Sequence, residues 1–205
     1  MLGRRSCLLA SLAGVGLLAW QRQALAGGQL EEPLADAVRT ALSAAIADRA
    51  PPQPEFADSA AHMAYLRWLV AVSDRLRARH TEMGGRQEFL QTLWYESRRA
   101  GLPTALVLGL IEVESAFRKF AVSSAGARGY MQVMPFWARV IGDGDASILF
   151  HLQTNLRFGC VILRHYLERE NGDLFLALGR YNGSRAKAPY ALSVLGSQKK
   201  WELPA

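Results

Sequence analysis

Apolar residues recur at helical spacing along most of the chain. Within residues 32–48 they come every four positions, and three prolines within residues 51–54 follow. A second helical pattern covers residues 59–80, and Gly84-Gly85 is expected to end it. The expected inward face of this second helix consists of Met63, Leu66, Val70 and Leu76. The pattern predicts two helices joined by a proline-rich linker.

The strongest apolar signal lies in residues 105–113. This stretch is apolar nearly all round, with Glu112 as the exception, so its helix should be buried. Ala105 and Gly109 lie one turn apart and would admit another helix closely. Residues 121–135 contain glycines and a proline, which predicts turns with a short extended piece. Further helices are expected over residues 86–100, 151–169, 173–181 and 188–199.

Residues 1–26 have the pattern of a secretory signal peptide. Arg4 and Arg5 form a positive start, and residues 7–20 are an apolar run without a charge. Ala24-Leu25-Ala26 then supplies small residues for cleavage. An uncleaved membrane anchor is the alternative, but the run is shorter than the ~20 residues that span a bilayer. The mature chain is therefore expected to have no stable membrane span.

The patterns above predict the domain organisation, and the composition then excludes some classes of function. The expected organisation is a signal peptide (1–26), a helical extension with the linker (27–85) and one further domain (86–205). Cleavage removes three arginines and no acid, so the net charge falls from +6 to +3. Without a basic stripe, this mild charge argues against nucleic acid. Cys160 would be the last cysteine left, and the four histidines lack ligand-like spacing, so we expect no metal and no cofactor.

Glu114 is the residue with the clearest chemical potential. It ends the predicted buried helix, just before Ser115. Burial and the negative end of the helix dipole both raise the pKa of such a carboxyl group. An acid that stays protonated near neutral pH suits the cleavage of a glycosidic bond. A buried ion pair is the alternative on these grounds. Glu112 is expected to be a salt-bridged or solvated edge residue.

Three motifs around Glu114 carry a family resemblance. They are Glu114-Ser115, the stretch Gly129-Tyr130-Met131-Gln132-Val133-Met134-Pro135, and the stretch Ala177-Leu178-Gly179-Arg180-Tyr181-Asn182-Gly183. In this order they resemble the Glu-Ser, Gly-Leu-Met-Gln and Ala-Tyr-Asn-Ala-Gly motifs of the soluble lytic transglycosylase domain, a relative of goose-type lysozyme. The resemblance covers about residues 86–200. It implies a mainly α, lysozyme-like fold with a short extended segment that lines a glycan groove.

The resemblance also implies an activity and a set of site residues. The family cleaves the MurNAc-GlcNAc β-1,4 bond of peptidoglycan and leaves 1,6-anhydromuramic ends, with Glu114 in the position of the catalytic acid/base. If residues 129–134 are extended, Tyr130, Gln132 and Met134 share one face, which can line the groove. Tyr130 replaces the usual Leu and is expected to add a stacking surface for sugar. The implied substrate-binding residues are Ser123, Tyr130, Gln132, Met134, Tyr181 and Asn182.

Two other functions stay open. Ordinary glycosidases use two carboxylates, and Asp143 and Asp145 are the nearest candidates. They lie in a Gly-Asp-Gly-Asp turn, where helix capping is expected and a calcium site is the alternative. A hydrolase of the same fold and a non-catalytic peptidoglycan-binding scaffold are therefore the alternatives. The expected location is the periplasm, and the sequence does not separate general wall turnover from work with a cell-envelope assembly.

Overall fold

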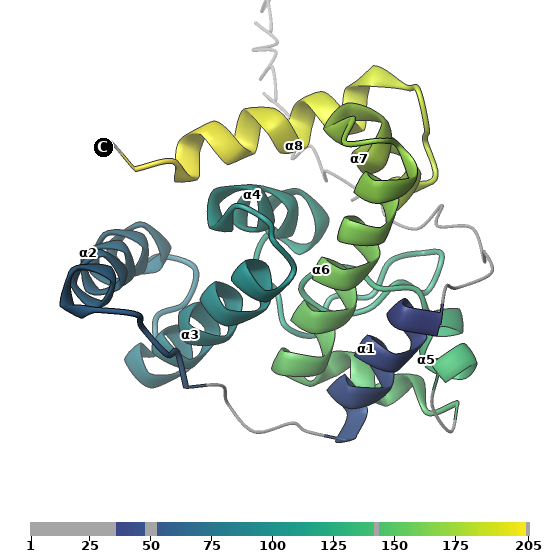
Figure 1. Cartoon of the computed structure of the whole chain (residues 1–205). Helices are drawn as coiled ribbons and strands as arrows, with labels where there is room; N and C mark the ends of the chain where they lie inside the picture. The colour runs from purple at the N-terminus through teal and green to yellow at the C-terminus, as the bar shows by residue number, and fades with distance from the viewer. Residues whose placement is uncertain (1–35, 48–52, 142–143, 204–205) are drawn as a thin grey trace, which may run out of the picture.

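The computed structural model describes residues 36–47, 53–141 and 144–203 (Figure 1). The predicted signal peptide lies outside these residues. The described segments form eight α helices and one short 3-10 helix, η1. In chain order these are α1 (Asp36–Ala47), α2 (Ser59–Leu76), α3 (Met83–Arg99), α4 (Thr104–Ser115), α5 (Pro135–Ile141), η1 (Ala146–Phe150), α6 (Leu152–Arg169), α7 (Leu174–Asn182) and α8 (Ala188–Trp201).

The fold is mainly helical, as predicted. Extended structure within the described segments is limited to two isolated antiparallel bridges, which join Val122 to Arg128 and Arg128 to Val133. None of the described helices has the length and hydropathy needed to cross a bilayer.

Helix α4 lies at the centre because its sequence is apolar on almost every side. Residues 106–111 are all buried, and α8 runs across the helix (Figure 1). The two backbones approach closely at Gly109, where an added Cβ would lie 2.6 Å from the Gln198 backbone nitrogen. The expected close helix contact at this glycine is confirmed. It fixes α8 over the end of α4 that carries Glu114.

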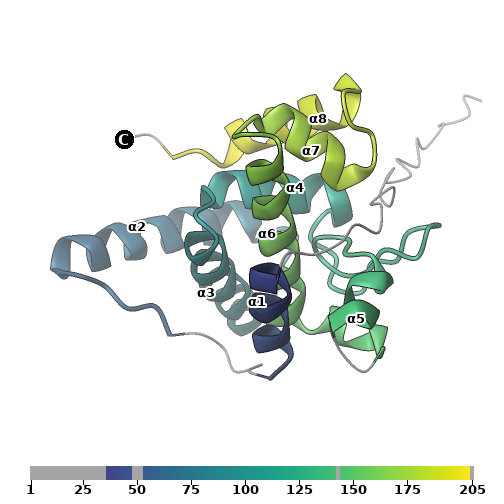
Figure 2. The ribbon, with the colours of Figure 1, turned by 45° about the vertical axis from the view of Figure 1, so that its right-hand side comes forward.

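Helix α6 packs against both α3 and α7 (Figure 2). Its predicted apolar stripe is buried at Leu156, Cys160 and Leu163. A buried ion pair adds a polar tie between α6 and α3. The Arg157 guanidinium donates to the Glu96 carboxylate at 2.7 and 2.8 Å. Because both charged groups are paired and hydrogen-bonded, their burial is tolerated.

The predicted inward face of α2 is wrong. Met63, Leu66 and Val70 are 51%, 37% and 64% exposed. The buried face instead consists of Tyr65, Trp68, Val72 and Leu76. Tyr65 and Trp68 pack against Trp94 of α3, with ring centroids 5.1 and 4.9 Å apart. Aromatic rings bury more apolar area than the aliphatic stripe, so they determine which face turns inward.

The predicted end of α2 is also wrong. The helix ends at Leu76, and Gly84-Gly85 lies in the first turn of α3. There the Glu82 side chain accepts hydrogen bonds from the backbone nitrogens of Gly84 and Gly85. These glycines therefore lie at the start of α3 and not at the end of α2. Leu42 of α1 and Tyr65 of α2 belong to the same hydrophobic core as the later helices.

Candidate active site

Glu114 occupies the last turn of α4 and is 3% exposed. The Tyr190 hydroxyl, from α8, donates a hydrogen bond to Glu114 Oε1. Burial raises the pKa of Glu114 to about 8, and the Tyr190 hydrogen bond offsets part of that rise. The expected raised pKa is confirmed. The residue is thus a neutral acid near pH 7 and can donate a proton.

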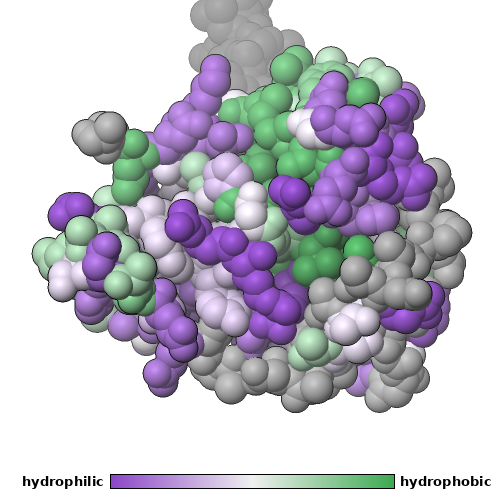
Figure 3. Space-filling model, in the orientation of Figure 1, coloured by the Kyte–Doolittle hydropathy of each residue, from purple (hydrophilic) through white to green (hydrophobic). Residues whose placement is uncertain are grey.

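A cleft of about 790 Å³ adjoins this carboxyl group. One wall comes from the end of α4, with Glu114, Ser115 and Arg118. The opposite wall comes from the end of α7, the following segment and α8, and includes Asn182 and Leu192. Apolar side chains gather over α7 and α8, next to hydrophilic ones (Figure 3). A cleft of mixed character beside a protonated acid is suited to a polar ligand with apolar faces.

Asn182 contributes an unsatisfied polar atom. Its Nδ2 donates to Ser184 Oγ at 3.1 Å. Its Oδ1 is buried and has no hydrogen-bond partner among the described residues. A buried acceptor without a partner costs free energy unless a ligand or water satisfies it. Asn182 is therefore a candidate for ligand contact in the cleft.

Glu112 also lines the cleft, but its environment is the opposite of that of Glu114. Its carboxylate accepts hydrogen bonds from Arg79 Nη1 at 2.8 Å and Trp201 Nε1 at 2.9 Å, and a third from Ser197 Oγ. Burial alone would raise its pKa, but these hydrogen bonds together lower it. The expectation of a salt-bridged edge residue is confirmed. Glu112 stays ionised, with its oxygens occupied by donors.

The segment from α3 to the end of the described residues matches a known protein family. The profile described as "Transglycosylase SLT domain" matches residues 93–203. The chain belongs to the transglycosylase SLT domain family. The matched segment begins within α3 and contains all of the cleft, whereas α1 and α2 precede it. The domain boundary expected at residue 85 stays a prediction.

Similar proteins include two named enzymes and one solved structure. "Membrane-bound lytic murein transglycosylase C" of Actinobacillus pleuropneumoniae is 36% identical over 105 residues, 47% of this chain and 28% of that protein. "Transglycosylase" of Enterobacteria phage PRD1 is 32% identical over 106 residues, 52% of this chain and 38% of its own length. An inactive mutant of lytic transglycosylase Slt from Pseudomonas aeruginosa is 21% identical, with a TM-score of 0.49, over 68% of this chain and 29% of that one. The chain spans less than two fifths of each.

Several motif residues of the SLT domain shape its loops. Ser123 Oγ accepts from the Ala127 backbone nitrogen at 3.1 Å. Buried Gln132 donates from Nε2 to the carbonyl oxygens of Ala121 and Gly129, at 3.1 and 2.9 Å. Tyr181 is buried too, and its hydroxyl donates to the Met131 carbonyl at 2.7 Å. These side chains lie outside the residues that line the cleft at Glu114.

Residues 121–135 consist of turns with isolated bridges, as expected, but residues 129–134 are not extended, so the condition for one shared groove-lining face is not met. Gly129 and Gln132 have positive φ angles of 76° and 48°, so residues 129–132 form turns. Asn155 of α6 stabilises them by accepting from the Met131 nitrogen at 2.8 Å. The alternation of faces expected for a strand is lost. Tyr130 and Gln132 are both buried, and Met134 is half-buried against the core.

Tyr130 is placed differently from the expectation of a sugar-stacking surface. It is 5% exposed, and its ring packs on Phe89 and His80 at centroid distances of 4.9 and 5.8 Å. Burial raises the pKa of its hydroxyl to about 12. The Tyr130 ring fills the core at the position where the family usually has Leu, so little of the ring is free to stack on a ligand.

The acidic turn before η1 caps a helix. Asp145 Oδ1 accepts from the Ser147 backbone nitrogen at 2.8 Å, as expected for a capping residue. Asp143 lies outside the described residues. Asp145 does not line the cleft at Glu114.

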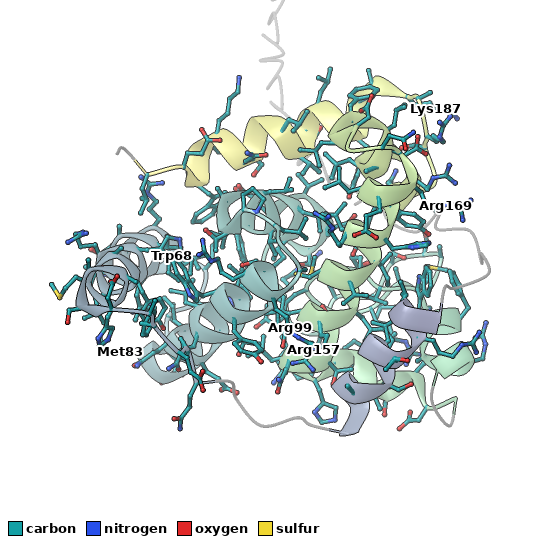
Figure 4. The ribbon with its side chains drawn as sticks, in the orientation of Figure 1. Trp68, Met83, Arg99, Arg157, Arg169 and Lys187 are labelled. Carbon is teal, nitrogen blue, oxygen red and sulfur yellow. The ribbon has the colours of Figure 1, made fainter. Side chains whose placement is uncertain are left out.

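A second, larger hollow of about 990 Å³ lies away from Glu114. It is bounded by residues 53–57 together with parts of α2, α3 and α6. Arg99 and Arg157 both line it and lie close together at the lower centre of Figure 4. Its acidic lining residue Glu55 is exposed. The smaller cleft is therefore the candidate active site, since it holds the neutral buried acid.

Tyr190 lines the cleft and hydrogen-bonds to Glu114, a contact that the sequence motifs do not predict. It lies 76 positions after Glu114, and its local pattern shows only the start of a helix. The structure brings the two side chains together because α8 crosses α4.

Proposed function

We propose that this protein is a lytic transglycosylase that acts on the glycan strands of peptidoglycan, with Glu114 as its acid/base. The observation that carries the proposal is a buried carboxyl group with a pKa of about 8, at the wall of a cleft, within an SLT domain. The names of the relatives, given above for those proteins, support the same class of reaction.

In the proposed reaction, a single carboxyl group acts twice. Neutral Glu114 donates its proton to the glycosidic oxygen as the bond from C1 to that oxygen breaks. The resulting carboxylate then accepts the proton of the same muramic acid's 6-hydroxyl, as O6 bonds to C1. The product is a 1,6-anhydro ring, and no water is consumed. Tyr190 orients the carboxyl group, and its hydrogen bond favours the carboxylate formed after the first step.

Ligand contacts are proposed for part of the predicted residue set. We infer that Asn182 contacts the glycan, because its buried Oδ1 has no hydrogen-bond partner in the part of the chain that the structure describes. We infer an indirect role for Ser123, Gln132 and Tyr181, whose hydrogen bonds hold the turns between α4 and α5.

A hydrolase is the second candidate function, because Glu112 supplies another carboxylate to the cleft lining. Retaining and inverting hydrolases need a second carboxylate that attacks the sugar or activates water. Glu112 suits that role poorly, since Arg79, Ser197 and Trp201 already donate to it. A non-catalytic scaffold would not need the neutral acid at all.

Mass analysis of muropeptides from purified sacculi distinguishes these functions. The wild-type protein should release fragments with 1,6-anhydromuramic ends, lighter by one water than hydrolysis products. Release of reducing ends alone would make the protein a hydrolase. Tight binding to sacculi without any release would make it a scaffold.

We further propose that the protein is exported to the cell envelope, the periplasm of a cell with two membranes. The positive start, apolar run and Ala24-Leu25-Ala26 support a signal peptide over residues 1–26. N-terminal sequencing of native protein should find a chain that begins near Gly27. Recovery of an intact Met1 start from the envelope fraction would contradict cleavage.

A further inference from the structure

An aromatic pair of one exposed and one half-buried ring lies just beyond the cleft. Phe120, in the segment after α4, is 70% exposed. Its ring meets that of Phe150, the last residue of η1, at a centroid distance of 5.8 Å and an interplanar angle of 52°. Val122, two residues after Phe120, is 60% exposed. Single exposed apolar residues are ordinary, but here two exposed residues adjoin a half-buried ring from a segment about 30 residues away.

Two cations lie over these aromatic rings. Lys119 Nζ lies 5.4 Å from the centre of the Phe120 ring, and the Arg128 guanidinium lies 5.5 Å from that of Phe150. Neither cation forms a salt bridge with a carboxylate in the described part of the chain. We call Lys119, Phe120, Val122, Arg128 and Phe150 the aromatic platform.

The platform adjoins the cleft through the chain itself. Arg118 lines the cleft and comes two residues before Phe120, a separation of at most about 7 Å between Cα atoms. Arg118 is held in place, because its backbone nitrogen and its Nε both hydrogen-bond to the Ser115 carbonyl, at 3.1 and 3.0 Å. A polymer that leaves the cleft past Arg118 therefore meets the platform next.

The chemistry of the platform matches a glycan strand. The C–H faces of a pyranose ring are apolar and pack on exposed aromatic rings, as other apolar groups do. The peptides attached to muramic acid carry carboxylates, which suit Lys119 and Arg128. The segment between α4 and α5 lies on the side of the molecule away from α2 (Figure 2).

We propose that the aromatic platform is an accessory subsite that binds a sugar of the glycan strand outside the cleft. Phe120 and Phe150 stack on the ring, and Lys119 and Arg128 bind carboxylates of the attached peptide. The nature of the ligand rests on the proposed function, whereas the platform itself does not depend on catalysis by Glu114.

Binding to purified sacculi tests the subsite without cleavage. The parent is Glu114→Gln, which leaves the sacculi intact. Adding Phe120→Ala should weaken binding on the order of tenfold, since much of one exposed ring is buried on stacking. Phe120→Tyr should restore it, because the ring is kept. Met83→Ala is the matched control, since Met83 is 73% exposed and lies beside α2 on the other side of the molecule (Figure 4).

A second measurement, of kcat/KM on long and short substrates, tests whether the platform binds a distant part of the glycan strand. In the active protein, Phe120→Ala should lower kcat/KM on long glycan strands and leave short muropeptides unchanged, because short substrates do not reach the platform. Equal binding of parent and Phe120→Ala to sacculi overturns the subsite. So does Phe120-dependent binding to phosphatidylglycerol vesicles in place of sacculi, which would make the patch a membrane contact. Failure of the proposed function would instead show as inactive wild-type protein in the product analysis.

Discussion

At the residue scale, the site depends on one carboxyl group kept neutral by its surroundings. The pKa of Glu114 is raised to about 8 because burial penalises the carboxylate. Glu112, two residues earlier, is held ionised by three donors from two other segments, Arg79 after α2 and Ser197 and Trp201 of α8. Two glutamates of one helix thus differ in protonation near pH 7 because their partners differ.

Replacing Glu114 by Gln should abolish most turnover. The amide keeps the size of the side chain and still accepts the Tyr190 hydroxyl, but it cannot transfer a proton. General acid–base catalysis typically contributes ~10²–10⁴-fold, so clearing of sacculus turbidity should slow by at least that order. Glu168→Gln is the control, since Glu168 is exposed in a pair with Arg164. A Glu114→Gln protein that clears sacculi at the wild-type rate would contradict the mechanism.

The same substitution should make the protein more stable at neutral pH. In the unfolded chain Glu114 ionises near pH 4.5, whereas in the folded state it stays protonated up to about pH 8. The unfolded state therefore binds fewer protons between these values, and wild-type stability falls as the pH rises through that window. Gln removes the loss, which amounts to about 3 kcal/mol at pH 7. Urea unfolding should show a difference at pH 7 that is absent at pH 4.

Tyr190→Phe should move the pH profile of activity. The lost hydroxyl stabilises the carboxylate form of Glu114, so its removal raises the pKa of that group further. In the proposed mechanism the acid must be protonated, so wild-type activity should decline as the pH rises through about 8. In the variant this decline should begin at a higher pH, with a lower kcat at the optimum. An unchanged alkaline limb would show that Tyr190 does not act on Glu114.

At the scale of elements, the contact between α4 and α8 builds the site. Its closeness depends on Gly109, since the backbone of α8 lies where a side chain would stand. Gly109→Ala should lower the free energy of unfolding by roughly 1–3 kcal/mol, because the added methyl group overpacks the contact. Urea denaturation measures this loss.

Gly196, on α8, is the matched control for Gly109. An added Cβ there meets no atom within 4 Å. Gly196→Ala should therefore stabilise the protein by about 0.5–1 kcal/mol, through the helix propensity of alanine. Equal effects at both positions would show that the close approach of α8 is unimportant for stability.

The inward face of a helix could be predicted from the sequence only where its apolar residues did not lie on two competing faces. The uniformly apolar residues 105–113 predicted a buried helix, and the stripe of residues 151–169 predicted α6 and its inward face. Helix α2 carries apolar residues on two faces, so periodicity alone could not choose between Met63-Leu66-Val70 and Tyr65-Trp68-Val72. The aromatic partner Trp94 on α3 made that choice.

At the scale of the whole molecule, a polar clamp holds the far wall of the cleft. Glu170, after α6, accepts from Arg180 of α7 at 2.7 Å and from Arg185 at 2.7 and 2.8 Å. Hydrogen bonds from Arg185 and then Arg180, together with their charges, lower its pKa to about 2 despite partial desolvation. The clamp joins three segments and positions the chain just after Asn182.

Glu170→Gln should weaken both folding and catalysis at neutral pH. Because the folded pKa is depressed, the stability that Glu170 contributes is present above pH 4.5 and is lost as the pH falls to about 2. Urea midpoints of variant and wild type should differ at pH 7 and converge near pH 2. kcat/KM should fall as the cleft wall loosens, while the alkaline limb set by Glu114 stays in place.

The sequence by itself determined the helices with a single apolar face, the buried end of α4, and the motifs that predict an SLT domain. These features are local, because periodicity and short motifs express what each segment needs from its immediate surroundings. The tertiary structure decided that Tyr130 fills the core, that Tyr190 meets Glu114, and that Phe120 meets Phe150. Each of these contacts joins segments that are far apart in the chain, so it depends on how closely two helices or loops pack. Gly109 permits the close packing of α8 on α4, and the turns at residues 129–132 place Tyr130 in the core.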